Sequence, residues 1–390
     1  MYADDTVLLS DSRVKLQKLL NCYINYCENW KLCINPDKTK VIIFGKNYSK
    51  PNIKIYGENL EVVNSFKYLG ITFNKSGRMM QSIKDNIEKA RKAFYAIMNR
   101  CKDKSIPLDC KLELFSKCIE PILLYGCELW GIEDHAVIET FRLKCYKIMM
   151  KAKSCTPSYM IYGEMGILPF NCSIHKRMIS YWTKVVSCRP DMLIRQLYNI
   201  MYAESVNNVW YPKWLERIKN ILQSSGFGYL WNLQTNIRDV DKKQLQSRLN
   251  DIALQQVIAT CRNSNKGNNY LALKKSWTQE TYLTILDDKN ALYLFKFRTA
   301  NHRLPVESGR FNGTEYKDRI CQHCFRDIGD EFHYLLMCPI FDKERKTFLL
   351  EHHIKHPNML TYISLMTSTN EKLLNNLSLF AKRIMNTIRT

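Results

Sequence analysis

Residues 2–10 read YADDTVLLS, and this stretch places two adjacent acids, Asp4 and Asp5, between short apolar segments. Aspartate is a common turn former, so the pattern predicts a tight hairpin with both acids at its turn. Carboxylate oxygens are the ligands that Mg²⁺ prefers, and a pair of such ions can stabilise both the attacking hydroxyl and the departing pyrophosphate of a polymerase reaction. A solvated turn is the alternative interpretation, because four residues alone are a weak signal.

The segment after the acids contains a helical pattern and then a strand pattern. A broad apolar face predicts a helix over residues 12–31, capped by Ser10 or Asp11. Pro36 ends any helix, and VIIF at residues 41–44 is typical of a buried strand. These patterns predict a small α/β unit at the start of the chain.

The rest of the chain is predominantly helical in pattern. Aromatic and β-branched residues over 52–74 still predict paired short strands, with a turn at Glu58–Asn59. From about residue 79, apolar residues recur every three or four positions, which predicts a helix with a basic outer face. The polar stretch CRNSNKGNNY, residues 261–270, is the predicted linker. Further helices are predicted near residues 108–130, 135–151, 171–188, 191–206, 212–223, 242–260, 279–300, 341–350 and 370–388.

The composition limits the class of protein. A length of 390 residues allows two or three domains, and a hydrophobic fraction of 46% is enough for packed cores. The 58 Lys and Arg residues exceed the 37 Asp and Glu residues and give a formal net charge of +21. Nucleic acid is therefore the first partner to expect. A basic protein without such a partner is the alternative.

Cysteine usage and hydropathy indicate the compartment. Most of the fifteen cysteines lie singly within apolar helical patterns, unlike the dense cysteines of a short secreted scaffold. We therefore expect reduced thiols and an intracellular location, cytoplasmic or nuclear. The longest apolar runs are too short to span a bilayer, so we expect no membrane partner.

Four residues near the end of the chain have the spacing C-x2-C-x8-H-x4-C, and they are Cys321, Cys324, His333 and Cys338. Zn²⁺ favours tetrahedral sets of thiolate and imidazole ligands, and a site closed by four protein ligands is structural. The alternative is four unrelated core positions among fifteen cysteines. His323 stands between the first two cysteines, where it would point away from an ion they share, so it is left out of the predicted set.

Basic residues flank this Cys/His cluster: Arg298, His302, Arg303, Arg310, Lys317, Arg319, Arg326, Lys343, Arg345 and Lys346. We expect Arg303, Arg310, Arg319 and Arg326 to contact the phosphates of nucleic acid. Exposed aromatic residues such as Phe311 would add base stacking, a combination that suits single-stranded or structured RNA.

The start of the chain resembles a known family. YADDTVLLS, a helix, LCINPDKTKVIIFG and NSFKYLGITF follow in an order and at distances that resemble the latter half of a reverse-transcriptase palm, specifically that of non-LTR (LINE-type) retrotransposons. The resemblance implies that Asp4 and Asp5 bind metal and that Tyr2 lies beside the growing primer end. It also implies that Lys38 lies near the incoming nucleotide. The primer-grip hairpin, by the same resemblance, contains Phe66, Tyr68, Leu69 and Gly70.

The resemblance extends over essentially the whole chain. IYGEMGILPF, HKRMISYWTKVV, GFGYLWNLQ, LYLFKFRTANHRLPVESGRF and GDEFHYLLMCP are similar to the region downstream of the reverse transcriptase in invertebrate elements of this kind. It implies that helices over 79–130 form the thumb, whose basic residues, Lys84, Arg91 and Lys92 among them, follow the phosphates of a primer–template duplex. RNA and DNA, including the element RNA, are the implied partners. Structural Zn²⁺ and, in the intact polymerase, Mg²⁺ are the implied metals.

One departure from the family pattern is expected to outweigh the matches. A family member carries another metal-binding Asp, and its fingers, before the Y-A-D-D turn, whereas this sequence starts at the turn. Two ions held by one turn would be poorly positioned, and metal catalysis depends on positioning. We therefore expect a fragment of a longer polymerase that is inactive by itself.

The expected fold is mainly α, with a small α/β palm remnant, a helical thumb and connector, and a small C-terminal zinc knuckle. Three functions stay open: the C-terminal portion of an RNA-directed DNA polymerase, a nucleic-acid-binding zinc-knuckle protein without polymerase activity, and a non-functional relic of an element. The expected divisions are a partial palm with the primer-grip hairpin at 1–75, thumb-like helices at 76–152, a helical connector at 153–262, a basic zinc-knuckle region at 263–350 and a helical tail at 351–390.

Overall fold

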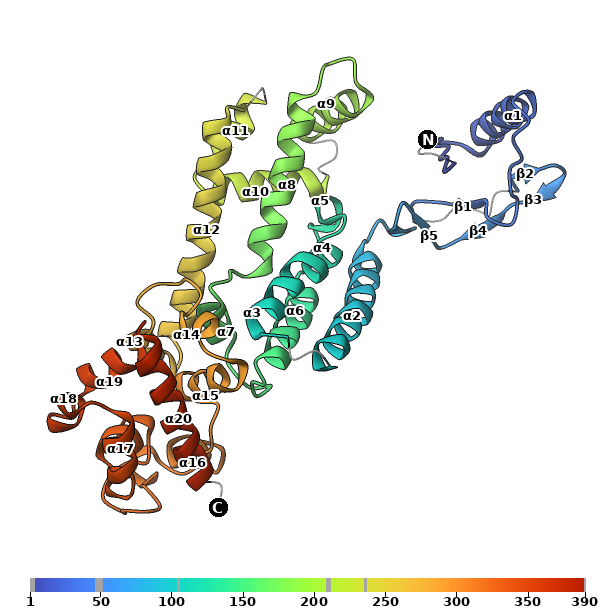
Figure 1. Ribbon diagram of the computed structural model, residues 1–390. Helices are drawn as coiled ribbons and strands as arrows, with labels where there is room; N and C mark the ends of the chain where they lie inside the picture. Colours follow the sequence, from blue (N-terminus) through green and yellow to red (C-terminus); the bar gives the residue numbers. More distant parts are fainter. Residues whose placement is uncertain (1–3, 46–51, 104–105, 208–211, 235–236, 389–390) are drawn as a thin grey trace.

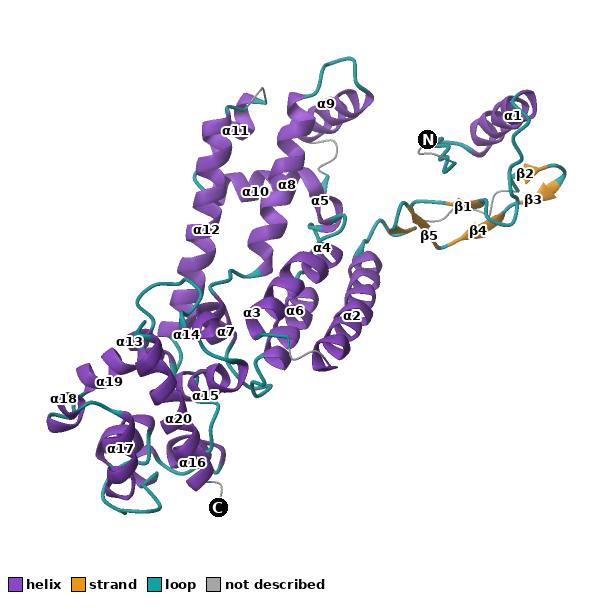
Figure 2. Cartoon of the chain, in the orientation of Figure 1, coloured by secondary structure: helices purple, strands orange, loops and turns teal. Residues whose placement is uncertain are grey.

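The computed structural model describes residues 4–45, 52–103, 106–207, 212–234 and 237–388. Helices make up 63% of the structure, and the named strands in the described residues all lie between residues 40 and 74 (Figure 2). This confirms the predicted fold class, mainly α with a small α/β part at the start. None of the helices in the described residues combines the length and apolar character that a bilayer crossing requires.

The N-terminal unit is the α/β part, and it stands apart from the helical body at one end of an elongated molecule (Figure 1). β1 pairs in parallel with β4, whereas β2–β3 and β5–β6 are antiparallel hairpins. The elements of this unit are α1 (Arg13–Asn29), β1 (Lys40–Ile42), β2 (Lys54–Ile55), β3 (Glu58–Asn59), β4 (Glu61–Val63), β5 (Ser65–Tyr68) and β6 (Ile71–Asn74).

Helix α1 confirms the helix predicted over residues 12–31, but its cap differs. The Ser12 hydroxyl accepts the Lys15 N–H at 3.3 Å, so Ser12 and not Ser10 or Asp11 is the N-cap. A small core holds α1 against the strands, separate from the core of the helical body. Its buried members are Leu20, Val41, Ile53, Ile55 and Leu60.

The turn predicted at Glu58–Asn59 is wrong by two residues. These two residues form strand β3, and the chain reverses at Tyr56 and Gly57, whose φ angles are 49° and 86°. A two-residue turn between twisted strands needs positive φ at both positions, which glycine adopts without strain. The turn was predicted at Asn59 because asparagine is a common turn former, but Gly57 decides where the turn lies.

The next helices form the layer that meets the β5–β6 hairpin. They are α2 (Met80–Asp103), α3 (Leu108–Leu114), η1 (Phe115–Ile119), α4 (Glu120–Leu123), α5 (Cys127–Trp130), α6 (Ala136–Met149) and α7 (Ser158–Met165). The helix predicted over 108–130 is therefore interrupted. Pro121 has no N–H for the helical ladder, and just before it the Glu120 N–H donates to the Phe115 carbonyl in a π-helical turn. Helix α4 ends at Leu123, and Gly126, at φ 71°, is the N-cap of α5.

In the middle of the chain, helices α8 and α12 run side by side (Figure 1). Its elements are α8 (Phe170–Ser187), α9 (Leu193–Val206), α10 (Lys213–Ser224), α11 (Gly228–Leu233), α12 (Asp239–Arg262) and α13 (Gly267–Leu273). The linker predicted at residues 261–270 is wrong. Cys261 and Tyr270 are buried in the core, so the polar residues between them form a tight turn that joins two packed helices.

The C-terminal part wraps short elements around the pair α15 and α20, which pack on each other. Its elements are α14 (Tyr282–Ile285), α15 (Asp288–Arg298), α16 (Pro305–Phe311), η2 (Tyr316–Asp318), η3 (His333–Met337), η4 (Pro339–Phe341), α17 (Asp342–Phe348), α18 (Glu351–Lys355), α19 (Met359–Met366) and α20 (Glu371–Thr387).

A buried ion pair ties this part to α7. Glu164 of α7 is fully buried, and the Arg298 guanidinium of α15 contacts its two carboxylate oxygens at 3.1 Å. The Tyr282 hydroxyl donates to the same carboxylate at 2.6 Å, and the Tyr270 hydroxyl donates at 2.9 Å. Buried charges are tolerated when they are paired and hydrogen-bonded, so this network fixes α15 relative to α7.

Candidate functional site

The two N-terminal acids lie in an exposed segment. Asp4 is in a turn, and both Asp4 and Asp5 are exposed. A contact of 2.9 Å between the hydroxyl groups of Thr6 and Tyr23 holds the segment to α1. Tyr2 lies outside the described residues, as does the first strand of the predicted hairpin. Within the described residues, neither acid belongs to a group of three or more metal-ligating side chains.

Lys38, predicted near the incoming nucleotide, lies in a turn between α1 and β1. Its N–H donates to the Asn35 side-chain oxygen at 3.1 Å, and the Thr39 hydroxyl donates to the Asn35 carbonyl at 2.8 Å. These contacts form the turn, and the Lys38 side chain is exposed. Lys38 is thus available for a ligand, on the same unit as the acids.

The predicted primer-grip residues form the β5–β6 hairpin. Phe66 pairs across the strands with Phe73, and the chain reverses at Leu69 and Gly70, whose φ angles are 48° and 79°. Phe66 and Leu69 are partly exposed, at 36% and 37%. The structure therefore brings Phe66, Tyr68, Leu69 and Gly70 together on one short hairpin.

The hairpin is fastened to the helical layer at its turn and along β6. The Tyr125 hydroxyl donates to the Leu69 carbonyl at 2.7 Å, and its ring lies so close to Gly70 that an added Cβ would come within 3.0 Å of it. The Ser82 hydroxyl accepts the Thr72 N–H at 2.9 Å and donates to the Thr72 carbonyl at 3.0 Å. Sequence reasoning missed Tyr125, which no local pattern connects to the hairpin.

Next to the hairpin, helix α2 has a basic face. Lys84, Arg91 and Lys92 are exposed on this helix, as predicted from its outer face. Arg91 makes an exposed ion pair with Glu88 at 3.3 Å, and its guanidinium lies 6.0 Å from the centre of the Phe141 ring. Lys84 and Arg91 are seven residues apart, so they lie on one face of the helix about 10 Å apart. This face begins where the hairpin is fastened.

The hairpin contributes to this basic face through Lys67, which sequence reasoning also missed. Burial and the neighbouring charge of Lys67 lower the pKa of Lys89 on α2, which places the two cations side by side. Burial opposes ionisation of Asp85 nearby, but hydrogen bonds from Thr72 and Gln81 and the charge of Lys67 outweigh it and lower the pKa of that carboxyl. Lys67 alternates with apolar residues along the strand, and side chains alternate between the two faces of a strand. This alternation could have placed Lys67 on the face opposite the apolar residues.

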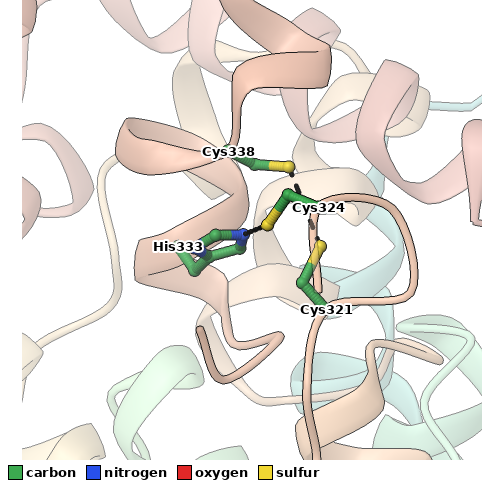
Figure 3. Close-up of side chains that lie close together, drawn as sticks. All are labelled: Cys321, Cys324, His333 and Cys338. Atoms are coloured by element: carbon green, nitrogen blue, oxygen red, sulfur yellow. Dashed lines mark hydrogen bonds between the residues drawn. The ribbon is translucent and has the colours of Figure 1, made fainter. Parts of the chain in front are cut away.

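The four predicted zinc ligands converge at the other end of the molecule (Figure 3). Their ligand atoms all lie within 4.8 Å of one another. The Cys321 and Cys338 sulfur atoms are 3.8 Å apart, and the Cys324 sulfur is 3.3 Å from Nε2 of His333. Cys321 and Cys338 are fully buried.

These distances fit a tetrahedral ion. Zn–S bonds of about 2.3 Å and Zn–N bonds of about 2.05 Å place two ligand sulfurs about 3.8 Å apart and a sulfur about 3.6 Å from the nitrogen. Nδ1 of His333 is buried, has no hydrogen bond within the described residues and lies 3.5 Å from the Asp327 carboxylate. A carboxylate facing the second ring nitrogen is the usual support for a metal-binding histidine. The donor set therefore fits Zn²⁺, with Nε2 as the ligand atom.

The local fold explains why distant ligands meet. The Cys321 N–H donates to the Asp327 carbonyl at 2.8 Å, which closes the loop that carries the first two cysteines. The π-helical turn η3 carries His333 and ends at Cys338, whose N–H donates to the His333 carbonyl at 2.8 Å. Burial raises the pKa of Cys338 to about 12, so a thiolate at this position requires a nearby cation.

Two arginines of the predicted basic flank are corrected. Arg298 is buried against Glu164, and Arg345 is buried and donates to the carbonyls of Leu335 and Cys338 at 3.0 and 2.9 Å. They are structural cations, and Arg345 fixes the backbone of a cluster ligand. Their charge was visible in the sequence, but their buried partners were not.

The four arginines predicted to contact phosphates have different surroundings. Arg303 and Arg326 are exposed. Arg310 is half-buried and contacts Glu307 at 3.4 Å. The Arg319 guanidinium donates to the carbonyls of Thr314 and Val306 at 2.9 to 3.0 Å, so its hydrogen-bonding capacity is largely used within the fold.

Comparison with known proteins identifies the class of the N-terminal segment. Residues 1–73 match the family model described as reverse transcriptase (RNA-dependent DNA polymerase). The matched segment includes the acid turn, Lys38 and the hairpin up to Phe73. Residues 1–73 are therefore similar to reverse transcriptases.

Individual relatives point to mobile elements. The chain is 28% identical over 168 residues to the RNA-directed DNA polymerase from mobile element jockey of Drosophila melanogaster, a match that covers 41% of this chain and 18% of that protein. It is 30% identical over 198 residues to a protein of the same species named "Probable RNA-directed DNA polymerase from transposon BS", which covers 48% of this chain and 22% of that protein. The match to the jockey polymerase of Drosophila funebris, 25% identical over 211 residues, covers 50% of this chain and 22% of that protein.

These matches confirm the predicted relation to the reverse transcriptases of non-LTR retrotransposons. The matched part of the chain spans only 18 to 22% of the length of these three relatives. The comparison with solved structures gives no significant match.

Proposed function

We propose that this chain is the C-terminal portion of a non-LTR retrotransposon RNA-directed DNA polymerase, and that it binds nucleic acid. The observation that carries the proposal is the fastening of the β5–β6 hairpin to the basic helix α2, at the end of the reverse-transcriptase match. The proposed units keep the predicted divisions: palm end with primer-grip hairpin at 1–75, thumb at 76–152, connector at 153–262, zinc-knuckle region at 263–350 and tail at 351–390.

The hairpin and α2 together offer a surface for a primer–template duplex. Phe66 and Leu69 present apolar area at the hairpin, where the last base pair would rest. Lys67 and then Lys84 and Arg91 continue from this point with positive charge. Phosphate contacts of this kind fix the position of a duplex without reading its sequence.

The Cys/His cluster is proposed as a structural zinc knuckle. Zn²⁺ held by Cys321, Cys324, His333 and Cys338 would supply cross-links that fold the loop and present the exposed Arg326 at its surface. Arg303 and Arg310 lie on the chain just before the knuckle. We propose RNA as the partner of this end of the molecule.

The polypeptide of these 390 residues is proposed to bind nucleic acid without extending a primer. Asp4 and Asp5 are the residues that would hold Mg²⁺, which supplies charge neutralisation at the reacting phosphates. Both acids are exposed, and no third ligand from the described residues is grouped with them. All fifteen cysteines are free thiols, which supports a reducing compartment, cytoplasmic or nuclear.

The test measures the salt dependence of binding to a labelled RNA–DNA primer–template and to single-stranded RNA. We expect log affinity to fall linearly with log salt, by about 0.9 per duplex phosphate contact. The double variant Cys321→Ser, Cys324→Ser should lose stoichiometric zinc and bind RNA more weakly. The matched control is Cys22→Ser with Cys118→Ser, because both thiols are exposed and far from the cluster in sequence. Folded protein that binds no nucleic acid at low salt would refute the proposal.

A further inference from the structure

A cavity of about 210 Å³ lies between the proposed thumb and the zinc-knuckle region. One wall is the loop that follows α6, and the opposite wall is the loop that follows α15, with the end of α20 closing the back. Its lining residues are Lys151, Lys153, Lys296, Asn301, His302, Arg303, Leu304, Met385 and Ile388. The function proposed above uses one residue of this lining, Arg303, but assigns no role to the cavity itself.

The lining is strongly cationic. Lys151, Lys153 and Arg303 contribute three positive charges, and no Asp or Glu of the described residues lines the cavity. Helix C-termini nearby contribute partial negative charge, roughly half an elementary charge each. The three full charges outweigh these dipoles, so the cavity favours an anion.

Two acids that contact residues in or beside the lining are already paired. Glu307 contacts both Lys266 and Arg310. Glu331 contacts Nε2 of His302 at 2.7 Å. Both of these carboxylates are therefore engaged within the fold.

The two walls are held together before any ligand arrives. The Asn301 side-chain oxygen accepts the Lys153 N–H at 2.9 Å and the Thr156 hydroxyl at 2.7 Å. The Lys153 ammonium donates to the His302 carbonyl at 2.7 Å. Burial lowers the pKa of Lys153, and Arg303 acts in the same direction although Glu307 opposes it. A pre-formed cluster of cations held at close range is stabilised by a bound anion.

An exposed aromatic ring stands beside the cavity. Phe311 is 63% exposed, and the Lys153 ammonium lies 5.6 Å from the centre of its ring. Phe311 and Lys153 also share the lining of a smaller adjacent pocket. An exposed ring next to a phosphate-sized cationic cavity is the arrangement that single-stranded nucleic acid uses, with its backbone on cations and a base stacked on an aromatic face.

We propose that this cavity binds a backbone phosphate of single-stranded nucleic acid while the neighbouring base stacks on Phe311. The inference rests on the proposed function and adds a specific site to it. A duplex does not fit the second contact, because its bases are stacked on each other and offer no free face to Phe311. The ligand class is a single strand, RNA or DNA, and not a free phosphate ion.

The experiment measures the affinity of the full 390-residue chain for a fluorescein-labelled oligouridylate over a range of salt concentrations. The variant Lys151→Gln with Arg303→Gln removes two exposed charges, so folding should be retained. The matched control, Lys243→Gln with Lys372→Gln, removes two exposed charges elsewhere. We expect the cavity variant, and not the control, to weaken binding and to reduce the salt slope by about 1.4, or 0.7 per lost contact with a single strand.

Two further measurements test which class of ligand the cavity binds. Phe311→Leu keeps an apolar side chain but removes the ring, and it should weaken binding about 5- to 150-fold. Inorganic phosphate at constant ionic strength should compete poorly with the oligouridylate, and efficient competition would overturn the assignment to a polynucleotide. Cavity and control variants with equal affinity and equal slope would overturn the inference and leave the proposed function intact. Wild-type protein that binds no single strand and no duplex would overturn both.

Discussion

Replacement of Arg298 by Leu tests whether the C-terminal part depends on its buried ion pair. Arg298 and Glu164 are both fully buried, and the guanidinium contacts the two carboxylate oxygens at 3.1 Å. It also donates to the Met366 carbonyl of α19. Arg298→Leu would leave the Glu164 carboxylate with hydrogen bonds from only Tyr270 and Tyr282.

The expected cost is large because a charge stays buried without its partner. Removal of one member of a buried ion pair typically destabilises a protein by about 3–5 kcal/mol. The two tyrosine hydroxyls still stabilise the Glu164 carboxylate, so we expect the lower end, about 3 kcal/mol. The control is Arg91→Leu, because Arg91 makes an ion pair with Glu88 in which both side chains are 52% exposed. Such surface pairs contribute about 0–1 kcal/mol.

The stability difference between Arg298→Leu and the wild type should depend on pH, because Glu164 is titratable. Burial alone would raise the pKa of Glu164, but the charge and hydrogen bonds of Arg298 and the Tyr282 hydroxyl outweigh it, and the pKa lies below its ordinary value. In the wild type, the stability that the ionised Glu164 contributes is present at a pH above the pKa of this group in the unfolded chain. It is lost as the pH falls through the lower pKa of Glu164 in the folded chain. In Arg298→Leu, burial dominates and raises the pKa of Glu164, so protonation relieves the buried charge. The stability difference between variant and wild type should therefore shrink as pH falls from neutral.

The assay is urea unfolding followed by circular dichroism, at neutral pH and at pH about 5. A destabilisation by Arg298→Leu no larger than that of Arg91→Leu would refute the reasoning. A difference from wild type that grows towards lower pH would refute it as well, because the buried carboxylate would then not be its cause.

Three other outcomes follow from the structure. Tyr125→Phe should loosen the β5–β6 hairpin by about 0.5–1.5 kcal/mol, since it removes the hydrogen bond to the Leu69 carbonyl, and hydrogen exchange of the hairpin amides would detect it. Cys338→Ser should abolish stoichiometric zinc in metal analysis and lower the melting temperature of the C-terminal part, and unchanged zinc would contradict the ligand set. Burial, then a neighbouring histidine and arginine, lower the pKa of His175 to about 4. The unfolded chain therefore binds the proton first, so wild-type stability should fall from about pH 6.5 towards pH 4, by up to about 3 kcal/mol, whereas His175→Gln should show a shallower fall.

Periodicity and spacing predicted the features that depend on local sequence. The three- and four-residue repeat from residue 79 predicted α2, and its polar positions predicted the exposed Lys84 and Arg91. The C-x2-C-x8-H-x4-C spacing predicted the residues that converge in the cluster. Both signals work because a helix face and a metal-binding loop are set by residues close in the chain.

Other elements carried no usable local signal. Helix α7 is not among the predicted helices, because it lies between Pro157 and Gly166 and is buried on all sides, so it shows no amphipathic stripe. Residues 261–270 look like a linker because most of them are polar, yet Tyr270 at the end of this stretch is buried.

Long-range partners were also beyond the sequence. Arg298 was read as a surface cation, but its partner, Glu164, is 134 residues away in the chain. Lys153 was not singled out at all, because its role depends on Asn301, which holds it from the opposite wall of the cavity. Charge is visible in a sequence, but whether that charge faces solvent, a carboxylate or a ligand is decided by packing.

The most direct test of the account is a primer-extension reaction with the 390-residue polypeptide, an RNA template annealed to a labelled DNA primer, Mg²⁺ and all four deoxynucleotides. Anisotropy of the same sample would report whether the duplex is bound. We predict a bound primer of unchanged length, because we propose that the hairpin and α2 hold the duplex, whereas Asp4 and Asp5 have no grouped third ligand in the described residues. Templated lengthening of the primer, or a folded protein that leaves the duplex free at low salt, would contradict the account.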